Sequence, residues 1–331
     1  MRETLYIFSS GHLKRRDNTL FFETKDGKKK FIPVENIKEI FIFGEVSFNT
    51  KLLNFLTQKE IILHYFNYYG YYSGSFYPRE HYNSGFMILN QVRSYDDSNK
   101  RLYLAKRFVE GAIKNSLKIL KYYKRREYDL DLEINMLEEV LVNVEKCISI
   151  EELMSFEGKA KGIYYNSFNK ILDNKDFCFN KRTRRPPQDY LNTLISFVNS
   201  LIYTYVLSEI YQTHLDPRIG FLHTTNFRRF SLNLDIAEIF KVVIGDRLLI
   251  SLIKHGIITR KDFDKGLEKI ILSDKGRRKI LEKMEEFLSR TITYRKINKK
   301  VSYRRLIRLE LYKLEKYLIG DEDYKPFVME W

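Results

Sequence analysis

Residues 102–120 read Leu-Tyr-Leu-Ala-Lys-Arg-Phe-Val-Glu-Gly-Ala-Ile-Lys-Asn-Ser-Leu-Lys-Ile-Leu, with apolar side chains at intervals of three and four. This spacing places them on one face of a helix. A second series with the same spacing runs from Ile134 to Val144. Proline, which removes a backbone donor and clashes with the preceding turn, is almost absent from these segments. The C-terminal three quarters of the chain is therefore predicted to be all-α.

The first eighty or so residues have a different pattern, in which short runs of β-branched and aromatic residues alternate with turn residues. The clearest signal is a hairpin, because Asp26-Gly27 lies between Thr19–Thr24 and Lys30–Val34 and glycine tolerates the positive φ of a tight turn. One helix is expected at Asn49–Thr57. The predicted fold class is α+β, a small N-terminal mostly-β domain followed by a larger all-α domain.

Two clusters of turn and cap residues set the domain boundaries. They are Asn83-Ser-Gly85 and Asp96-Asp-Ser-Asn99. We therefore place the β domain at residues 1–85, a linker at residues 86–98 and the helical domain at residues 99–331.

The chain is basic, since 58 Lys and Arg against 43 Asp and Glu among 331 residues give a net charge of +15. A hydrophobic content of 44% is typical of globular proteins and argues against disorder. No uninterrupted apolar run approaches the roughly 18 residues of a membrane-spanning helix. The first residues also lack the apolar core of a secretory signal, so we expect a cytoplasmic protein. Cys147 and Cys178 form no Cys-x-x-Cys pair, which indicates neither a disulfide scaffold nor a zinc finger.

The positive charge favours an anionic partner. A membrane surface would call for one long basic amphipathic helix or a basic tail, whereas these basic residues are spread through segments expected to fold. Nucleic acid is therefore the favoured partner on composition alone.

Two acidic residues lie within a predicted helix that is otherwise apolar. Asp235 and Glu238 are three residues apart, so both carboxylates lie on one face, one turn apart. Carboxylates in apolar surroundings are costly to desolvate unless a cation compensates them. Lys241 and Arg247 could do so as salt-bridge partners. A divalent metal, Mn²⁺ or Mg²⁺, is the alternative, and a histidine with carboxylates suits either ion.

Other candidates are weak when taken alone. Glu157 lies in a helical stretch beside a glycine, where an acid is usually solvated. His214 and His223 flank the turn Asp216-Pro-Arg-Ile-Gly220, and loop histidines are more often structural than catalytic. The residues alone leave these alternatives open.

Taken in order, however, the motifs around these residues resemble those of a known family, the large subunit of the CRISPR-associated integrases, which capture new spacers. The motifs are Phe156-Glu-Gly158 with Tyr164-Tyr165, Arg184-Arg-Pro-Pro-Gln-Asp189, Leu215-Asp-Pro-Arg-Ile-Gly-Phe-Leu-His223 and Leu234-Asp-Ile-Ala-Glu238 with Asp246-Arg247. The strand-rich opening, with Tyr6-Ile-Phe-Ser-Ser-Gly11, extends the resemblance over nearly the whole chain.

The resemblance implies an enzyme with a catalytic metal site. It assigns Glu157, His223 and Glu238 as ligands of Mn²⁺ or Mg²⁺, and Asp235 as a nearby acid that assists. Glu238 stands where some relatives have Asp, and both residue types supply oxygen ligands. The family reaction is attack of the 3′-hydroxyl of a short DNA fragment on a phosphodiester of the repeat array. Hydrolysis gives a metal-dependent nuclease activity. His214 falls outside the match.

DNA would be held by basic side chains that contact phosphates without reading sequence. The candidates are Lys181, Arg182, Arg184, Arg185, Arg228, Arg229, Arg304 and Arg305. The alternative for each of them is an ordinary solvated helix face. Tyr165 lies about two helical turns after Glu157 and is a candidate for stacking on a splayed base.

The resemblance also implies partners. They are double-stranded DNA fragments, the CRISPR repeat array, a second copy of the chain bound through the N-terminal β domain, and a small ferredoxin-like companion subunit. Two other functions stay open. One is a stand-alone, structure-specific DNA repair nuclease, and the other is a non-catalytic DNA-binding scaffold.

Overall fold

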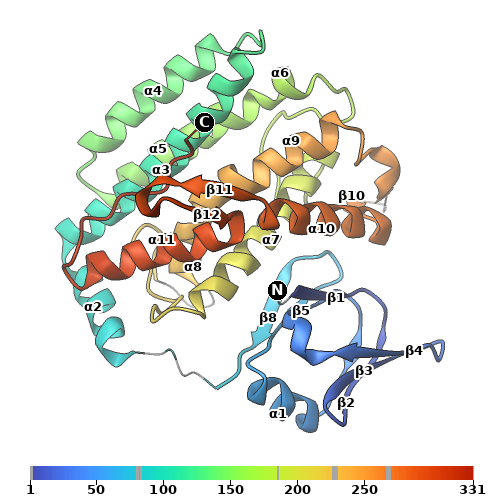
Figure 1. Cartoon of the computed structure of the whole chain (residues 1–331). Helices are drawn as coiled ribbons and strands as arrows, with labels where there is room; N and C mark the ends of the chain where they lie inside the picture. Colours follow the sequence, from blue (N-terminus) through green and yellow to red (C-terminus); the bar gives the residue numbers. More distant parts are fainter. Residues whose placement is uncertain are drawn as a thin grey trace. The chain divides into compact units, whose positions relative to one another are not determined.

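The computed structural model describes residues 3–79, 82, 84–184, 186–225, 230–265 and 270–330. It divides into two compact units, Met1–His81 and Tyr82–Trp331. The first unit is rich in strands and the second is mostly helical, which confirms the predicted α+β class (Figure 1).

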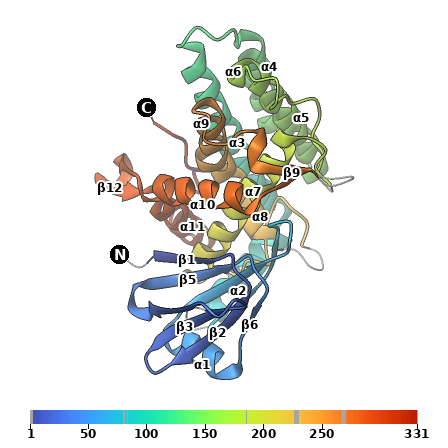
Figure 2. The same cartoon turned by 90° about the vertical axis from the view of Figure 1, so that its right-hand side faces the viewer.

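The N-terminal unit contains two four-stranded sheets (Figure 2). One has the order β1 (Glu3–Ile7), β5 (Ile37–Ile42), β7 (Ile62–Phe66) and β8 (Tyr72–Phe76). The other has the order β4 (Lys29–Pro33), β3 (Thr19–Thr24), β2 (Gly11–Arg16) and β6 (Val46–Ser47). In the first sheet β1, β5 and β7 are parallel and β8 is antiparallel to β7. The two sheets and α1 (Thr50–Gln58) share one apolar core.

Two local predictions in this unit are confirmed. Strands β3 and β4 pair antiparallel, and Gly27 in the connecting turn has a φ of 82°. The predicted helix forms as α1, and the side chain of Asn49 caps it by accepting a hydrogen bond from the backbone N–H of Leu52.

The C-terminal unit is built mainly from helices. They are α2 (Gly85–Asp96), α3 (Ser98–Lys124), α4 (Asp131–Lys146), α5 (Ile150–Asn166), α6 (Phe168–Leu172), α7 (Tyr190–Ile210), α8 (Ser231–Phe240), α9 (Arg247–Lys254), α10 (Asp274–Ser289) and α11 (Tyr303–Leu318). A π-helical turn, Lys241–Asp246, joins α8 to α9. Helices α3, α4 and α5 lie side by side, and α8 packs against α3 and α7 (Figures 1 and 2).

The sequence predicted an all-α unit, but this mainly helical unit also contains two short sheets. Strands β9 (Phe263–Lys265) and β10 (Ile270–Leu272) form one two-stranded sheet, and β11 (Thr291–Tyr294) and β12 (Lys299–Ser302) form another. Both sheets are too short to show an alternating pattern in the sequence.

The expected linker at residues 86–98 is instead helix α2. The boundary between the compact units falls between His81 and Tyr82 rather than at residue 85. Of the predicted turn and cap residues, two are helix caps: the Ser84 side chain accepts from Met87 N–H, and the Asp97 side chain accepts from the N–H groups of Asn99 and Lys100. Turn and cap residues are of the same types, so the sequence did not show that a helix lies between the two clusters.

Helix α7 is the central helix of the second unit. It is long and apolar enough to cross a membrane, and 83% of its most apolar window is buried inside the protein. Polar residues such as Asn192 and Ser196, both buried, interrupt its apolar sequence. These polar residues explain why the sequence shows no uninterrupted apolar run there. Burial of α7 inside the protein is typical of a core helix.

Candidate functional site

Helix α8 supplies two of the predicted site residues. Asp235 is fully buried and Glu238 is 4% exposed. They lie one turn apart as predicted, but their carboxylates contact different parts of the unit.

Asp235 binds the segment that carries His223. Its carboxylate accepts backbone N–H bonds from Phe221 (2.6 Å), Leu222 (3.0 Å) and His223 (3.0 Å), and it lies 2.8 Å from Nδ1 of the His223 ring. Because a carboxylate accepts, Nδ1 donates and Nε2 is the ring nitrogen left able to bind a cation. Asp235 therefore fixes both the position and the tautomer of His223.

Gly220 allows this close approach. A Cβ atom at Gly220 would lie 2.5 Å from the backbone carbon of Ser231 and 2.7 Å from Oδ2 of Asp235, both closer than side chains tolerate. The hydroxyl of Ser231 accepts from Gly220 N–H (2.9 Å) and donates to the carbonyl of Arg218 (2.6 Å). The first turn of α8 thus holds the preceding loop tightly against itself.

Two residues that sequence analysis did not select also hold this loop. Gln91 on α2 donates to the carbonyls of Asp216 (3.1 Å) and Ile219 (3.2 Å) and accepts from Asp216 N–H (2.7 Å). Arg101 on α3 donates to the carbonyl of Phe221 (3.1 Å). These contacts join residues 120 or more positions apart, so no local pattern could have revealed them.

The other two predicted ligands, Glu157 and Glu238, meet at one lysine. Lys161 forms an ion pair with Glu157, one turn away on α5, and its Nζ also lies 2.7 Å from Oε2 of Glu238 on α8. Lys241 contacts the other oxygen of Glu238 at 2.7 Å. The predicted salt-bridge partner Lys241 is thus confirmed, whereas Arg247 donates to the hydroxyl of Tyr303.

The charges in this cluster shift one another's ionisation. Burial alone would raise the pKa of the Glu238 carboxyl, but the ammonium groups of Lys161 and Lys241 outweigh burial and hold that pKa well below its usual range. Burial raises the pKa of Asp246 to about 7, against the opposing effect of Lys241. The cluster lines a small cavity of about 30 Å³. This is room for a water molecule or a small ion.

The predicted metal ligands do not form a ready-made group. Among the described residues, no three His, Cys, Asp or Glu side chains are grouped as metal ligands would be. Lys161 draws Glu157 and Glu238 together, while His223 is paired with Asp235. The donor types suit Mn²⁺ or Mg²⁺: the buried Oε1 atom of partly buried Glu157 makes no hydrogen bond beyond its ion pair, and a cavity adjoins both glutamates. The ligand assignment therefore stays a prediction.

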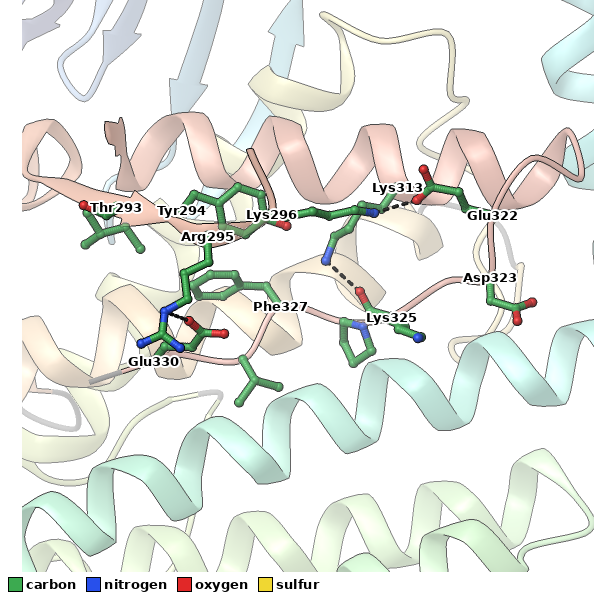
Figure 3. A pocket seen from close by; sticks show the side chains of 13 residues that line it. Thr293, Tyr294, Arg295, Lys296, Lys313, Glu322, Asp323, Lys325, Phe327 and Glu330 are labelled. Atoms are coloured by element: carbon green, nitrogen blue, oxygen red, sulfur yellow. Dashed lines mark hydrogen bonds and ion pairs between the residues drawn. The ribbon is translucent and has the colours of Figure 1, made fainter. Parts of the chain in front are cut away.

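A larger cavity, of about 560 Å³, lies between β11 and the C-terminal segment (Figure 3). Three of its cationic side chains have partners: Arg295 contacts Glu330 at 2.9 Å, Lys296 contacts Glu322 at 2.5 Å, and Lys313 donates to the carbonyl of Lys325 at 2.6 Å. It contains none of the predicted site residues.

The predicted DNA contacts divide into three groups. Arg185, Arg228 and Arg229 lie outside the described residues. The guanidinium of Arg182 donates to Asn192 and Ser196 of α7 (2.9 Å each). The guanidinium of Arg304 donates to buried Glu209 (2.9 Å).

These two arginines therefore have partners inside the protein. Lys181, Arg184 and Arg305 are exposed and can reach a phosphate. These three are the stronger candidates of the described set.

Tyr165 is not placed as expected for stacking on a base. It is 7% exposed and packs against the rings of Phe168 and Phe179, with centroids 5.3 Å and 5.6 Å away. Burial raises the pKa of its hydroxyl well above the usual value. Tyr165 is a core side chain that also lines the small cavity.

Comparison with known proteins identifies the family of the chain. The family model described as CRISPR associated protein Cas1 matches residues 5–286. The chain is 56% identical to a CRISPR-associated endonuclease Cas1 of Thermodesulfovibrio yellowstonii over 331 residues, which is 100% of both chains. A solved Cas1 structure from Thermotoga maritima superposes with a TM-score of 0.88 at 46% identity, covering 98% of this chain and all of that one.

Two more distant structures share the fold. A casposase bound to integration product has a TM-score of 0.87 at 23% identity, covering 99% of this chain and 93% of that chain. A Cas6-RT-Cas1–Cas2 complex has a TM-score of 0.86 at 20% identity, and this chain matches 36% of that longer chain. The family match and the full-length identity to a curated relative together show that the chain belongs to the Cas1 family of CRISPR-associated proteins.

Proposed function

We propose that this chain is a metal-dependent DNA endonuclease and integrase that inserts short foreign DNA fragments into a CRISPR array as new spacers. Its Cas1 family membership and the endonuclease name of its relative support this proposal. The structural observation that carries it is the meeting of Glu157 from α5 and Glu238 from α8 at one cation, beside a small cavity.

Glu157, Glu238 and His223 would hold the metal, through two carboxylates and Nε2 of the imidazole. Bound there, Mn²⁺ or Mg²⁺ stabilises negative charge on phosphate oxygens and lowers the pKa of an attacking hydroxyl or water. Asp235 does not need to touch the metal, because it keeps the Nδ1 proton on His223 and holds residues 221–223 in place. In the integration reaction the fragment's 3′-oxygen forms a bond to phosphorus, and the array strand's 3′-oxygen leaves with a proton.

DNA would be held along exposed basic side chains, among which the described residues offer Lys181, Arg184 and Arg305. The proposed partners are the double-stranded fragment, the repeat array, a second copy of this chain bound through the N-terminal unit, and a small ferredoxin-like companion. The neighbour that contains Cas1 and Cas2 supports the companion through shared fold. We propose a cytoplasmic location, where all these partners meet.

The test is integration of a labelled fragment into a plasmid that carries a repeat array, with Mn²⁺ and the companion present. His223→Ala should lower the rate on the order of 100-fold, because it removes one proposed ligand. His214→Ala is the matched control, since this exposed histidine pairs with Glu315 outside the site and should leave the rate unchanged.

Three outcomes would contradict the proposal. Equal rates for His223→Ala and the unaltered chain would rule out the metal site. No cleavage or integration with any divalent ion would indicate a DNA-binding scaffold. Integration of equal efficiency without the companion would indicate a stand-alone repair nuclease.

A further inference from the structure

We infer that Lys161 is an internal counter-cation that competes with the divalent ion for Glu157 and Glu238. In the absence of metal it holds the two carboxylates together, and it must leave them when metal binds. The inference rests on the proposed function, because it takes these two glutamates as metal ligands.

Lys161 lies between the two glutamates. Its ammonium forms ion pairs with Glu157 of its own helix and with Glu238 of α8. The Glu157 and Glu238 side chains are 12% and 4% exposed, so two carboxylates this close and this buried would repel one another without a cation. Lys161 therefore stands where the shared cation of these two acids belongs.

The charges around Lys161 leave no room for an additional cation. Glu157, Glu238, Lys161 and Lys241 carry two negative and two positive charges, so these four ion-paired groups already balance. A divalent ion added to the four would give them a charge of +2 beside a cavity of about 30 Å³. The ion would also need the same oxygen lone pairs that Lys161 contacts, at bond lengths of roughly 2.0–2.2 Å. An ammonium and a metal ion cannot occupy this position together.

Accessibility identifies which lysine can leave. The Lys161 side chain is 31% exposed, whereas that of Lys241 is 17% exposed. Lys161 can turn its ammonium into solvent by rotating about its own side-chain bonds, as long lysine side chains do at surfaces. The cost of removing this ammonium is subtracted from the metal's binding free energy.

The test is binding of Mn²⁺ alone to the full chain without DNA, by calorimetry and by the electron paramagnetic resonance signal of free Mn²⁺. Lys161→Met should bind Mn²⁺ roughly tenfold more tightly than the unaltered chain. Lys159→Met is the matched control, because Lys159 is exposed on the same helix and the charge change is equal. It should alter the affinity by less than about twofold.

Thermal unfolding gives an independent readout. Without metal, Lys161→Met should unfold at a lower temperature than the unaltered chain, and Mn²⁺ should raise its Tm by more. Lys161→Gln keeps a polar side chain without the charge and should behave in the same direction if Lys161→Met folds poorly. Unchanged or weaker Mn²⁺ binding by the folded variants would overturn the inference.

One further variant separates this inference from the proposed function. If the unaltered chain binds Mn²⁺, Glu157→Gln weakens binding and Lys161→Met does not tighten it, then the role of Lys161 alone is wrong. If the unaltered chain and Glu157→Gln bind Mn²⁺ equally or not at all, the metal site itself is wrong and both proposals fall.

Discussion

Two neighbouring parts of the site are stabilised in different ways. Asp235 is satisfied by three backbone N–H groups and one imidazole, all fixed by the fold. Glu157 and Glu238 are satisfied by the ammonium groups of flexible lysines. The arrangement around Asp235 rests on groups that the backbone fixes, whereas the arrangement around Glu157 and Glu238 rests on lysine side chains that can rotate. Carboxylates on helices of one unit are thus held either by a fixed set of donors or by side chains with freedom to move.

The largest effect is expected from removing the carboxylate of Asp235. Asp235→Ala leaves four donors in and around residues 221–223 without their acceptor, and unmade buried hydrogen bonds are costly. The free energy of unfolding should fall by about 3 kcal/mol, measured by urea unfolding without metal. Asp264→Ala, at an exposed position, is the control and should change it by less than about 0.5 kcal/mol. Equal losses for the two variants would show that Asp235 is not an anchor.

A smaller effect is expected at Asp246, which lines the same cavity as Glu157 and Glu238. Burial raises the pKa of Asp246 to about 7, above its usual 3.8. Between these values the native chain keeps a proton that the unfolded chain releases, so this contribution to stability is lost as pH rises. Relative to Asp246→Asn, the unaltered chain should lose about 2 kcal/mol of unfolding free energy between pH 5 and pH 7.

The readout for Asp246 is the difference between two unfolding curves at each pH, so that other titrating groups cancel. Asp264→Asn serves as control, because its carboxylate is exposed. If Asp246→Asn and the unaltered chain changed in parallel between pH 5 and pH 7, the buried carboxyl would not titrate in this range.

The smallest effect is expected from Gln91 on α2, which binds the loop that precedes α8. Gln91→Ala removes three hydrogen bonds to residues 216 and 219 and should lower the unfolding free energy by about 1.5 kcal/mol. Hydrogen exchange should accelerate at residues 219–223 and stay unchanged at residues 157–161. Gln188→Ala, which alters an exposed side chain, is the control. Equal acceleration in both segments would mean that the loop bound by Asp235 and the segment around Glu157 are not independent.

Much of the fold was predictable because its signals are local. The turn at Gly27, the cap at Asn49 and the periodicity of residues 102–120 each depend on neighbours within a few positions. The pairing of Asp235 and Glu238 on one helix followed from the same periodicity. The predicted linker was wrong because the turn and cap residues at its two ends, Ser84 and Asp97, cap successive helices instead of bounding an extended segment.

What the sequence could not predict depends on contacts between distant helices. The sequence does not single out Lys161, because its ion pair with Glu238 of α8 forms only in the folded chain. Arg182 and Arg304 belong to basic runs, yet their guanidiniums donate to α7. Tyr165 follows Glu157 by about two helical turns, but two phenylalanines cover its ring. In each case the tertiary partner, rather than the residue type, decides the role.

The close approach at Gly220 has a consequence for the mutational tolerance of the chain. Even a methyl group at Gly220 would overlap the backbone of Ser231, so a library of all substitutions there should yield no functional member. Gly158, next to Glu157, differs: a Cβ atom there would meet no atom of the described residues within 4 Å. Inside the folded chain, Gly158 is free to vary. Any intolerance found at Gly158 in such a library would therefore report on something that the chain meets only while it is working.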